Sequence, residues 1–242
     1  MNGRIRAVFR KELREFRRNK LVVGTMAALP IFFLAVPMTS VLALKAGASM
    51  AAMKATVGSA GLALFLVPLI LPTIIAGYGV VGEREQGTLE AVLTTPVRRE
   101  ELLIGKALGA VVPSVAVAYV LFAVFAIVVR IAALPQVVSL VWQLPEFLAF
   151  VLFTPLLASF SIWVGLAVSA RSSDVRVAQQ LSALAVLPMV GLISLFTFRL
   201  VTPSVRVAIV GAVLLAALDL GAWRIVSGLF DRERLLTRYG RP

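Results

Sequence analysis

Few side chains in this sequence could do chemistry, and their types restrict what that chemistry could be. The 242 residues include no histidine and no cysteine, which excludes disulfides, thiolate chemistry and imidazole-based catalysis or metal ligation. A Gly-x-x-x-x-Gly-Lys-Ser/Thr loop, which would cradle nucleotide phosphates, does not occur either. We therefore expect no catalytic, cofactor or metal site in the chain and no enzyme activity of its own.

Polar groups inside apolar segments are the remaining candidates. Asp219 is the one acid deep within an apolar run, and an Asp at the centre of a membrane helix costs about 2.5–3.5 kcal/mol. We expect a structural ion pair with Arg171, Arg176 or Arg224 in preference to a role in proton or cation movement. The other intramembrane polar candidates are Gln179 and Gln180.

The elements that must position these groups are long apolar segments. The sequence is 60% hydrophobic and only 15% charged, much less charge than a soluble domain of this length carries. A membrane span needs roughly 20 apolar residues, and runs this long form helices because backbone groups in lipid must be satisfied internally. We predict an all-α polytopic membrane protein, a single transmembrane domain over 1–242. Its six spans are expected at about 21–44, 60–82, 106–129, 147–170, 177–198 and 206–224.

The first apolar segment has a basic front, as a secretory signal peptide has. Its apolar part, 21–44, is longer than the roughly 7–15 residues of a signal peptide. We therefore expect it to remain in the protein as a membrane span.

The basic residues predict an orientation. The flanks of the apolar segments fall into two sets, one for each side of the membrane. One set, 1–20, 83–106, 171–176 and 224–242, holds 8, 4, 2 and 5 Lys and Arg residues, whereas the opposite set holds five altogether. Basic flanks remain in the cytoplasm, so both termini, segment 83–105 and the tail 225–242 are expected there. The net charge of +12 then reflects orientation and attraction to anionic lipid, and we expect no nucleic-acid partner.

Residues 1–20 are predicted to form an amphipathic helix at the membrane surface. Ile5, Phe9, Leu13 and Phe16 recur at helical spacing and make one apolar stripe, while Arg and Lys fill the other faces. The alternative is a basic tail beside the first span.

Proline and glycine modify this topology. Residues 131–145 are apolar but bracketed by Pro135 and Pro145, so we expect a short helix on the outer surface and not a seventh span. Prolines inside five of the six spans are either hinges or static kinks. Gly105 and Gly109 form a G-x-x-x-G pattern, a candidate helix contact.

A polar segment interrupts the apolar runs between spans two and three; residues 82–106 read GEREQGTLEAVLTTPVRREELLIGK. Gly87 permits a sharp change of direction. Thr88 is a suitable N-cap, and Glu90 follows it in the first turn, where the helix dipole favours an anion. Glu100 and Glu101 favour the first turn of the next helix.

The middle of this segment is predicted to be a very short amphipathic helix. Leu89, Val92 and Leu93 share one face, and Thr95–Pro96 ends the helix because a residue before proline avoids the helical region. A helix of about two turns is not stable alone in water, so its apolar face needs a partner. An ordinary loop between two spans is the alternative interpretation.

The same segment closely resembles the signature of the type-2 permease family of ABC transporters. The family form is close to G-E-R-E-x-G-T-L-E, then T-P-V, then R-x-E-L-x-x-G-K, and every part is present here. A second stretch, SARSSDVRVAQQLSALAVLPM at 169–189, resembles the family's entry into its fifth span. The basic amphipathic N-terminus and the six spans match as well.

The resemblance implies a partner for the short helix. In that family it is the coupling helix, a cytoplasmic element between spans two and three that docks into a cleft on a separate ATPase subunit. Carried over by position, the ATPase-coupling residues would be Glu83, Arg84, Glu85, Gly87, Thr88, Leu89, Glu90, Val92, Leu93, Thr95, Pro96, Arg98 and Glu101.

The function implied is that of a permease subunit in an ATP-driven exporter of a prokaryotic cell membrane. Two copies of a cytoplasmic ABC ATPase would bind ATP and Mg²⁺, and a second permease subunit would complete a homodimer within the lipid bilayer. An ATPase-independent secondary transporter or channel that uses Asp219 is the alternative. A non-transporting relay protein would need a bulky external domain, for which the outer segments are too short.

Overall fold

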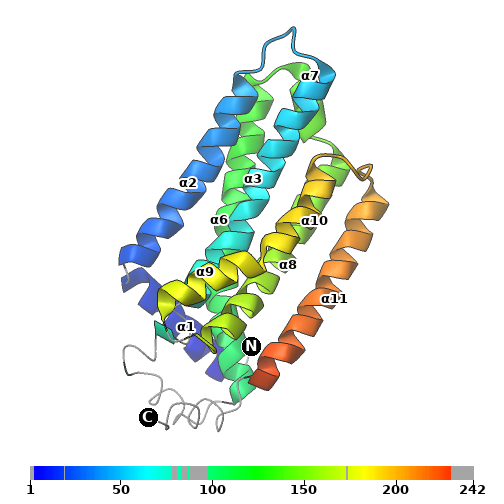
Figure 1. Ribbon diagram of the computed structural model, residues 1–242. Helices are drawn as coiled ribbons and strands as arrows, with labels where there is room; N and C mark the ends of the chain where they lie inside the picture. Colours follow the sequence, from blue (N-terminus) through cyan, green and yellow to red (C-terminus); the bar gives the residue numbers. More distant parts are fainter. Residues whose placement is uncertain are drawn as a thin grey trace.

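The computed structural model describes residues 3–18, 20–77, 81–82, 87, 98–172 and 174–229. Within these ranges the chain is a bundle of α-helices and contains no β-strand (Figure 1), which confirms the predicted all-α class there. The helices are α1 (Gly3–Arg18), α2 (Lys20–Leu42), α3 (Met50–Gly77), α6 (Arg99–Ala132), α7 (Pro135–Val141), α8 (Leu144–Ser169), α9 (Val175–Ala185), α10 (Leu187–Thr197) and α11 (Val205–Leu229).

The long helices run between two ends of the bundle, which we name after the short helices found there. At the α1 end, α1 packs across the start of α6, and at the α7 end, α7 packs against α3 and α6. Figure 1 shows α2 beside α3, and α11 along α8 at the right-hand edge.

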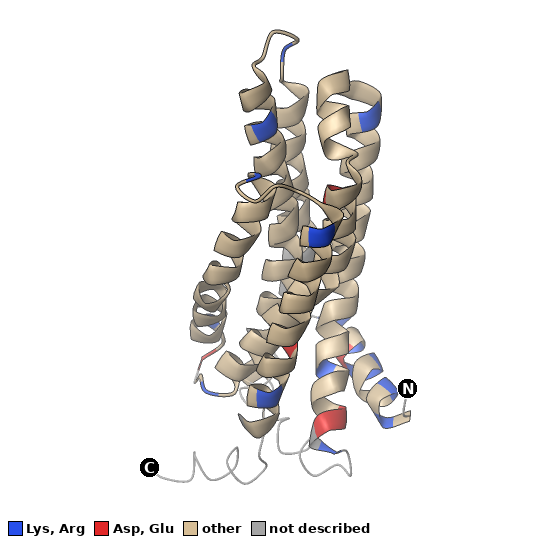
Figure 2. Cartoon of the chain, turned by 90° about the vertical axis from the view of Figure 1, so that its right-hand side faces the viewer, with Lys and Arg blue, Asp and Glu red and all other residues tan. Residues whose placement is uncertain are grey.

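Five helical segments among the described residues are long and apolar enough to cross a membrane. They are Met50–Ala76, Glu100–Ala132, Leu144–Ser169, Val175–Thr197 (α9 and α10 together) and Val205–Gly228. The described apolar part of α2, Ala27–Leu42, is shorter, so the first of the six spans, 21–44, stays a prediction. Charged residues lie toward the two ends of the bundle and leave its middle almost free of them, as the colours of Figure 2 show. The chain is a multi-pass membrane protein.

Two helices differ from the expected spans. α3 begins at Met50 and includes Lys54, which the sequence places before the second span. The region of the fifth span is divided into α9 and α10, which meet at Val186. Pro188, in the first turn of α10, lacks an N–H group and cannot continue the hydrogen-bond ladder of α9. The prolines inside α2, α3, α6 and α8 lie within continuous helices.

Residues 131–145 contain the expected short helix, α7, which is too short to be a seventh span. Val137, Val138, Leu140 and Val141 are buried, so this helix packs into the end of the bundle. Its position on the outer surface of a membrane stays a prediction.

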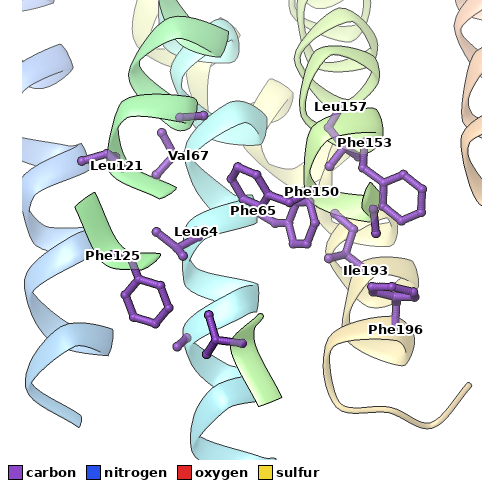
Figure 3. Packing of buried hydrophobic residues seen from close by; sticks show 14 of the residues in the cluster. Leu64, Phe65, Val67, Leu121, Phe125, Phe150, Phe153, Leu157, Ile193 and Phe196 are labelled. Atoms are coloured by element: carbon purple, nitrogen blue, oxygen red, sulfur yellow. The ribbon is translucent and has the colours of Figure 1, made fainter. Parts of the chain in front are cut away.

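The main hydrophobic core lies between α3, α6, α8 and α10, and phenylalanines form its centre (Figure 3). The Phe150 ring stacks on Phe122 with centroids 4.1 Å apart and lies 4.9 Å from Phe65. Phe153 meets Phe196 of α10 edge to face at 5.7 Å. In a bilayer such contacts stabilise the bundle through close packing, because lipid tails are as apolar as the side chains themselves.

Hydroxyl groups inside the helices mostly bond to their own backbone. The Ser114 hydroxyl donates to the carbonyl oxygen of Ala110 at 2.8 Å, and the Ser182 hydroxyl donates to that of Ala178 at 2.7 Å. Such bonds let a polar side chain reside in an apolar span at low cost. Thr154 and Ser161, on α8, keep buried hydroxyl oxygens without a partner among the described residues.

Candidate functional site

The candidate site is the α1 end of the bundle, where the predicted coupling segment joins α3 to α6. Of its proposed ATPase-coupling residues, the structure describes Gly87, Arg98 and Glu101. Gly87 has φ +68°, in the left-handed region that suits glycine and the predicted change of direction. The others lie outside the described residues: Glu83, Arg84, Glu85, Thr88, Leu89, Glu90, Val92, Leu93, Thr95 and Pro96.

Glu101 organises the start of α6. The helix begins at Arg99, with Glu100 and Glu101 in its first turn as predicted. A side-chain oxygen of Glu101, Oε2, accepts a hydrogen bond from the backbone N–H of Arg98 at 2.9 Å. The same oxygen lies 3.6 Å from Nη1 of Arg4 on α1. Glu101 therefore caps α6 and links it to the N-terminal helix.

Two glycines bring α1 and α6 into close contact. A Cβ atom built on Gly105 would lie 2.6 Å from Cβ of Val8, and one built on Gly109 would lie 2.8 Å from Cβ of Glu12. Real Cβ atoms do not approach so closely, so any larger residue would push the helices apart. The G-x-x-x-G pattern is thus a helix contact, as predicted, and its partner is α1.

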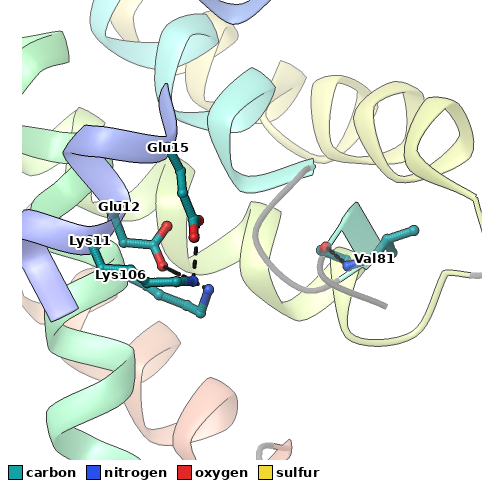
Figure 4. A network of polar contacts seen from close by, with 6 residues as sticks. Lys11, Glu12, Glu15, Val81 and Lys106 are labelled. Carbon is teal, nitrogen blue, oxygen red and sulfur yellow. Dashed lines mark hydrogen bonds and ion pairs between the residues drawn. The ribbon is translucent and has the colours of Figure 1, made fainter. Parts of the chain in front are cut away.

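Between these glycines, Lys106 forms a buried ion pair with Glu12 (Figure 4). The lysine Nζ lies 2.9 Å from Oε1 of Glu12, and the two side chains are 3% and 4% exposed. Lys11 lies 3.4 Å from the same carboxylate oxygen and 3.1 Å from Glu15. Two desolvated charges are tolerated when each satisfies the other, so the pair ties α1 to α6 at one specific register.

The sequence pattern did not identify this contact. The predicted apolar stripe of α1 is only half-buried, whereas Val8 and Glu12 are the buried residues of the helix. The face of α1 that packs on α6 is therefore rotated away from the predicted apolar stripe. It includes Glu12, an acid that lies among basic residues in the sequence. The position of Lys106 between Gly105 and Gly109, two glycines of a predicted helix contact, was the signal from which this buried ion pair could have been predicted.

Val81, which follows α3 in the chain, is bonded to Ser169, the last residue of α8. The backbone N–H of Val81 donates to the hydroxyl oxygen of Ser169 at 3.2 Å (Figure 4). Val81 is fully buried and packs with Val175 and Ala178 of α9. Val81, just before the predicted coupling segment, and α6 after it are thus both held at this end of the bundle.

The two glutamines are not brought together. The Gln179 side-chain amide donates to the backbone carbonyl oxygen of Ile74 on α3 at 3.4 Å. Gln180, the next residue, is exposed. Gln179 therefore joins two helices, and Gln180 faces away from the bundle.

Asp219 lies on the stripe of α11 that faces α8, and its Oδ1 atom is buried. That oxygen has no hydrogen-bond partner among the described residues. Arg171, Arg176 and Arg224 are all exposed, and the described ion pairs join none of them to Asp219. The expected structural ion pair is therefore wrong for this arrangement, because the three arginines point out of the bundle while Asp219 points into it.

Comparisons with known proteins agree with this architecture. A family model described as "ABC-2 family transporter protein" matches residues 6–205. Over 106 residues, the chain is 41% identical to "Probable ABC transporter permease protein NosY" of Pseudomonas aeruginosa, a match that covers 42% of this chain and 37% of that relative. It is 38% identical over 107 residues to the protein of the same description from Stutzerimonas stutzeri, with the same coverage.

The matched regions thus cover less than half the length of these curated relatives. The family model, in contrast, covers most of the chain. It includes α6, the basic end of α1 and the 82–106 motif from which the resemblance was drawn. With its multi-pass helical bundle, this chain belongs to the ABC-2 family of transporter proteins.

Proposed function

We propose that the chain is the membrane-spanning subunit of an ATP-driven exporter. The observation that carries the proposal is the family match over residues 6–205, supported by the names of the relatives, which are probable ABC transporter permeases. Because the chain has no phosphate-binding loop, a separate cytoplasmic ATPase would bind ATP and Mg²⁺. ABC permeases generally work with such a subunit.

In this proposal the α1 end faces the cytoplasm of a prokaryotic cell, and α2 is the first of six spans. The basic residues of α1 support the assignment, since they are exposed: Arg4, Arg6, Arg10, Arg14, Arg17 and Arg18. Exposed arginines beside a span are attracted to the anionic lipids of the cytoplasmic leaflet.

The coupling step would use Thr88 to Thr95 as the element that docks on the ATPase. Movement of that element would reach α6 directly, since the helix begins at Arg99 and continues without interruption to Ala132 near the α7 end. The Glu12–Lys106 pair would carry α1 along with α6. A rigid helix anchored in this way can transmit a displacement across the whole bilayer.

Two permease subunits and two ATPase subunits would form the working unit, with a homodimer as the expected arrangement. Six helices are few to line and gate a pathway alone. The spans contain little polarity, which favours an apolar or amphipathic cargo over a free ion.

A secondary transporter or channel built around Asp219 is not favoured. Membership of the ABC-2 family points to an ATP-driven machine, and one acid deep in a span offers a poor relay for protons or cations.

The test is purification of the tagged chain from its native membrane in a mild detergent, followed by mass spectrometry of the proteins that accompany it. The variant carries Leu89→Asp and Leu93→Asp, which would place charge on the proposed docking face. The matched control carries Leu89→Met and Leu93→Met, which keep the face apolar. A second control, Leu144→Asp with Leu200→Asp, adds the same two charges at exposed sites of the α7 end.

We expect an ATPase with a phosphate-binding loop to accompany the original chain and both controls, and to be lost from the aspartate variant. If no such ATPase accompanies the original chain, the transporter proposal is wrong. Equal recovery of the ATPase with the aspartate variant would show that Leu89 and Leu93 are not part of the docking site.

A further inference from the structure

The half of the bundle nearer the α7 end contains an apolar groove of about 270 Å³ between α8, α10 and α11. Only apolar side chains and Gly211 line it. The Phe153 ring of α8 lies against the α11 backbone at one edge, where a Cβ atom on Gly211 would lie 2.8 Å from the ring Cζ. We call this feature the α10–α11 groove.

The groove exists because its two walls pack on different partners. α11 packs mainly on α8, whereas α10 packs mainly on α3 (Figure 1). The two walls diverge between these supports, and large side chains form the rim: Leu192 is 54% exposed and Leu214 is 61% exposed. Because both rim residues belong to membrane-spanning helices, the groove opens sideways toward lipid and not toward water.

The length of the groove corresponds to one leaflet. Its lining along α11 extends from Val207 to Leu218, and eleven residues of helix rise about 16 Å. The hydrocarbon core of a bilayer is about 30 Å thick. A groove that starts at the α7 end of α11 and covers half of that thickness has the dimensions of an extended acyl chain.

A cation lies at the end where a lipid headgroup would be. Arg206, in the first turn of α11, precedes the lining residue Val207 and is exposed. No ion pair among the described residues involves it. The acid of this end, Glu146, is already paired with Arg199 at 2.6 Å. Arg206 is therefore available to a phosphate group, and guanidinium groups bind phosphate well.

A transmembrane helix from a second copy of this chain fits the groove less well. Contacts between membrane helices are enriched in small residues, which allow the backbones to approach. The rim instead carries leucines, and Phe153 already covers Gly211. Bulky, flexible side chains around a narrow apolar slot suit a thin and flexible chain.

We propose that the α10–α11 groove binds one acyl chain of a bilayer phospholipid whose phosphate contacts Arg206. The lipid fills the space between two helices that do not pack on each other and holds α11 in the bundle. This site does not depend on ATP coupling. In the orientation proposed above, the lipid belongs to the outer leaflet.

The experiment uses the full chain in nanodiscs of phosphatidylcholine and phosphatidylglycerol that contain a phospholipid with a diazirine in the middle of one acyl chain. After illumination, mass spectrometry locates the adducts. In parallel, native mass spectrometry measures the phospholipid retained in detergent. The test variant is Leu218→Trp, which fills the groove. The control, Leu220→Trp, adds the same bulk at an exposed residue of α11 outside the lining.

We expect adducts concentrated on the lining residues and a loss of retained phospholipid of about tenfold in Leu218→Trp, with no loss in Leu220→Trp. Arg206→Gln should weaken retention of phosphatidylglycerol more than that of phosphatidylcholine. Adducts on the unmodified chain provide a test that does not depend on any variant folding.

Adducts spread evenly over other exposed residues such as Val120 and Ile127, or equal retention by the two tryptophan variants, would show only ordinary annular lipid and overturn the proposal. Protection of the groove from the diazirine lipid, with efficient disulfide formation between two chains that carry Leu218→Cys, would show that a second copy occupies it.

Discussion

The Nζ atom of Lys106 lies 2.9 Å from Oε1 of Glu12, and both side chains are almost fully buried although 94 positions separate them in the chain. Lys106 is part of the helix that follows the predicted coupling segment, and Glu12 is part of the basic N-terminal helix. The pair therefore fixes α1 to α6, the helix that would receive movement from the ATPase in the proposed complex.

Removing one member of this pair should destabilise the protein strongly. Glu12→Gln removes the buried carboxylate that lies 2.9 Å from the Lys106 ammonium, and breaking a buried ion pair costs about 3–5 kcal/mol. Glu15→Gln is the matched control, because Glu15 is 51% exposed and contacts Lys11 at the surface of α1. Its expected cost is about 0–1 kcal/mol. Thermal unfolding of the purified protein in detergent measures both.

The double variant Glu12→Leu with Lys106→Met separates charge from packing. It replaces the ion pair by apolar side chains, so most of the stability lost in Glu12→Gln should return. A double variant as unstable as the single one would mean that the lost stability does not come from an unbalanced buried charge.

Gly105→Ala should weaken the contact between α1 and α6. The added Cβ would lie 2.6 Å from Cβ of Val8, and overpacking of this kind costs about 1–3 kcal/mol. Gly191→Ala is the control, since nothing lies within 4 Å of its added Cβ in α10 and alanine is the better helix former by about 0.5–1 kcal/mol. Unfolding in detergent should therefore shift in opposite directions for the two variants. A stabilised Gly105→Ala would contradict the close approach of α1.

The Arg199–Glu146 pair should hold the α7 end together. Nη2 of Arg199 lies 2.6 Å from Oε1 of Glu146 and 3.4 Å from the Gln143 side-chain oxygen, so it connects the end of α10 to the start of α8. Arg199 also has φ +57°, which an arginine adopts only when contacts hold it there. Glu146→Ala should cost about 1–3 kcal/mol.

The readout is the rate at which an added protease cuts the connection between α10 and α11 in nanodiscs, where both membrane faces are accessible. Glu146→Ala should speed cleavage there. Arg130→Ala removes an exposed cation of α6 at the same end, which takes part in none of the described ion pairs, and should leave the rate unchanged. Equal rates in all three proteins would show that the pair does not restrain this connection.

Replacing Asp219 by leucine should stabilise the isolated chain. The buried Oδ1 atom has no partner among the described residues, and removing an unsatisfied buried polar group gains about 1–3 kcal/mol. Asp219→Asn keeps a polar group at this position and should therefore gain less stability than Asp219→Leu. A loss of stability in Asp219→Leu would mean that Asp219 meets a group outside the described residues. Unchanged transport in the leucine variant would exclude any role in proton movement.

Local patterns in the sequence determined the class of protein and much of its helical layout. Apolar runs identified a multi-pass membrane protein because hydropathy acts on each segment separately, whatever its neighbours are. The first turn of α6 follows from Glu100 and Glu101, whose charges interact with their own helix. The motif in 82–106 identified the family. Its docking helix and the membrane orientation stay predictions from the same patterns.

Only the tertiary structure decided which polar groups meet. Glu12 occupies a face of α1 that the apolar stripe did not mark, and Asp219 forms an ion pair with none of the three arginines proposed for it. The α10–α11 groove likewise depends on two helices that pack on different partners. Caps and hydropathy act over a few residues, whereas these relationships depend on the relative rotation and spacing of helices far apart in the chain. Gly105 and Gly109 set that spacing for α1 and α6, and so bring Lys106 within bonding distance of Glu12.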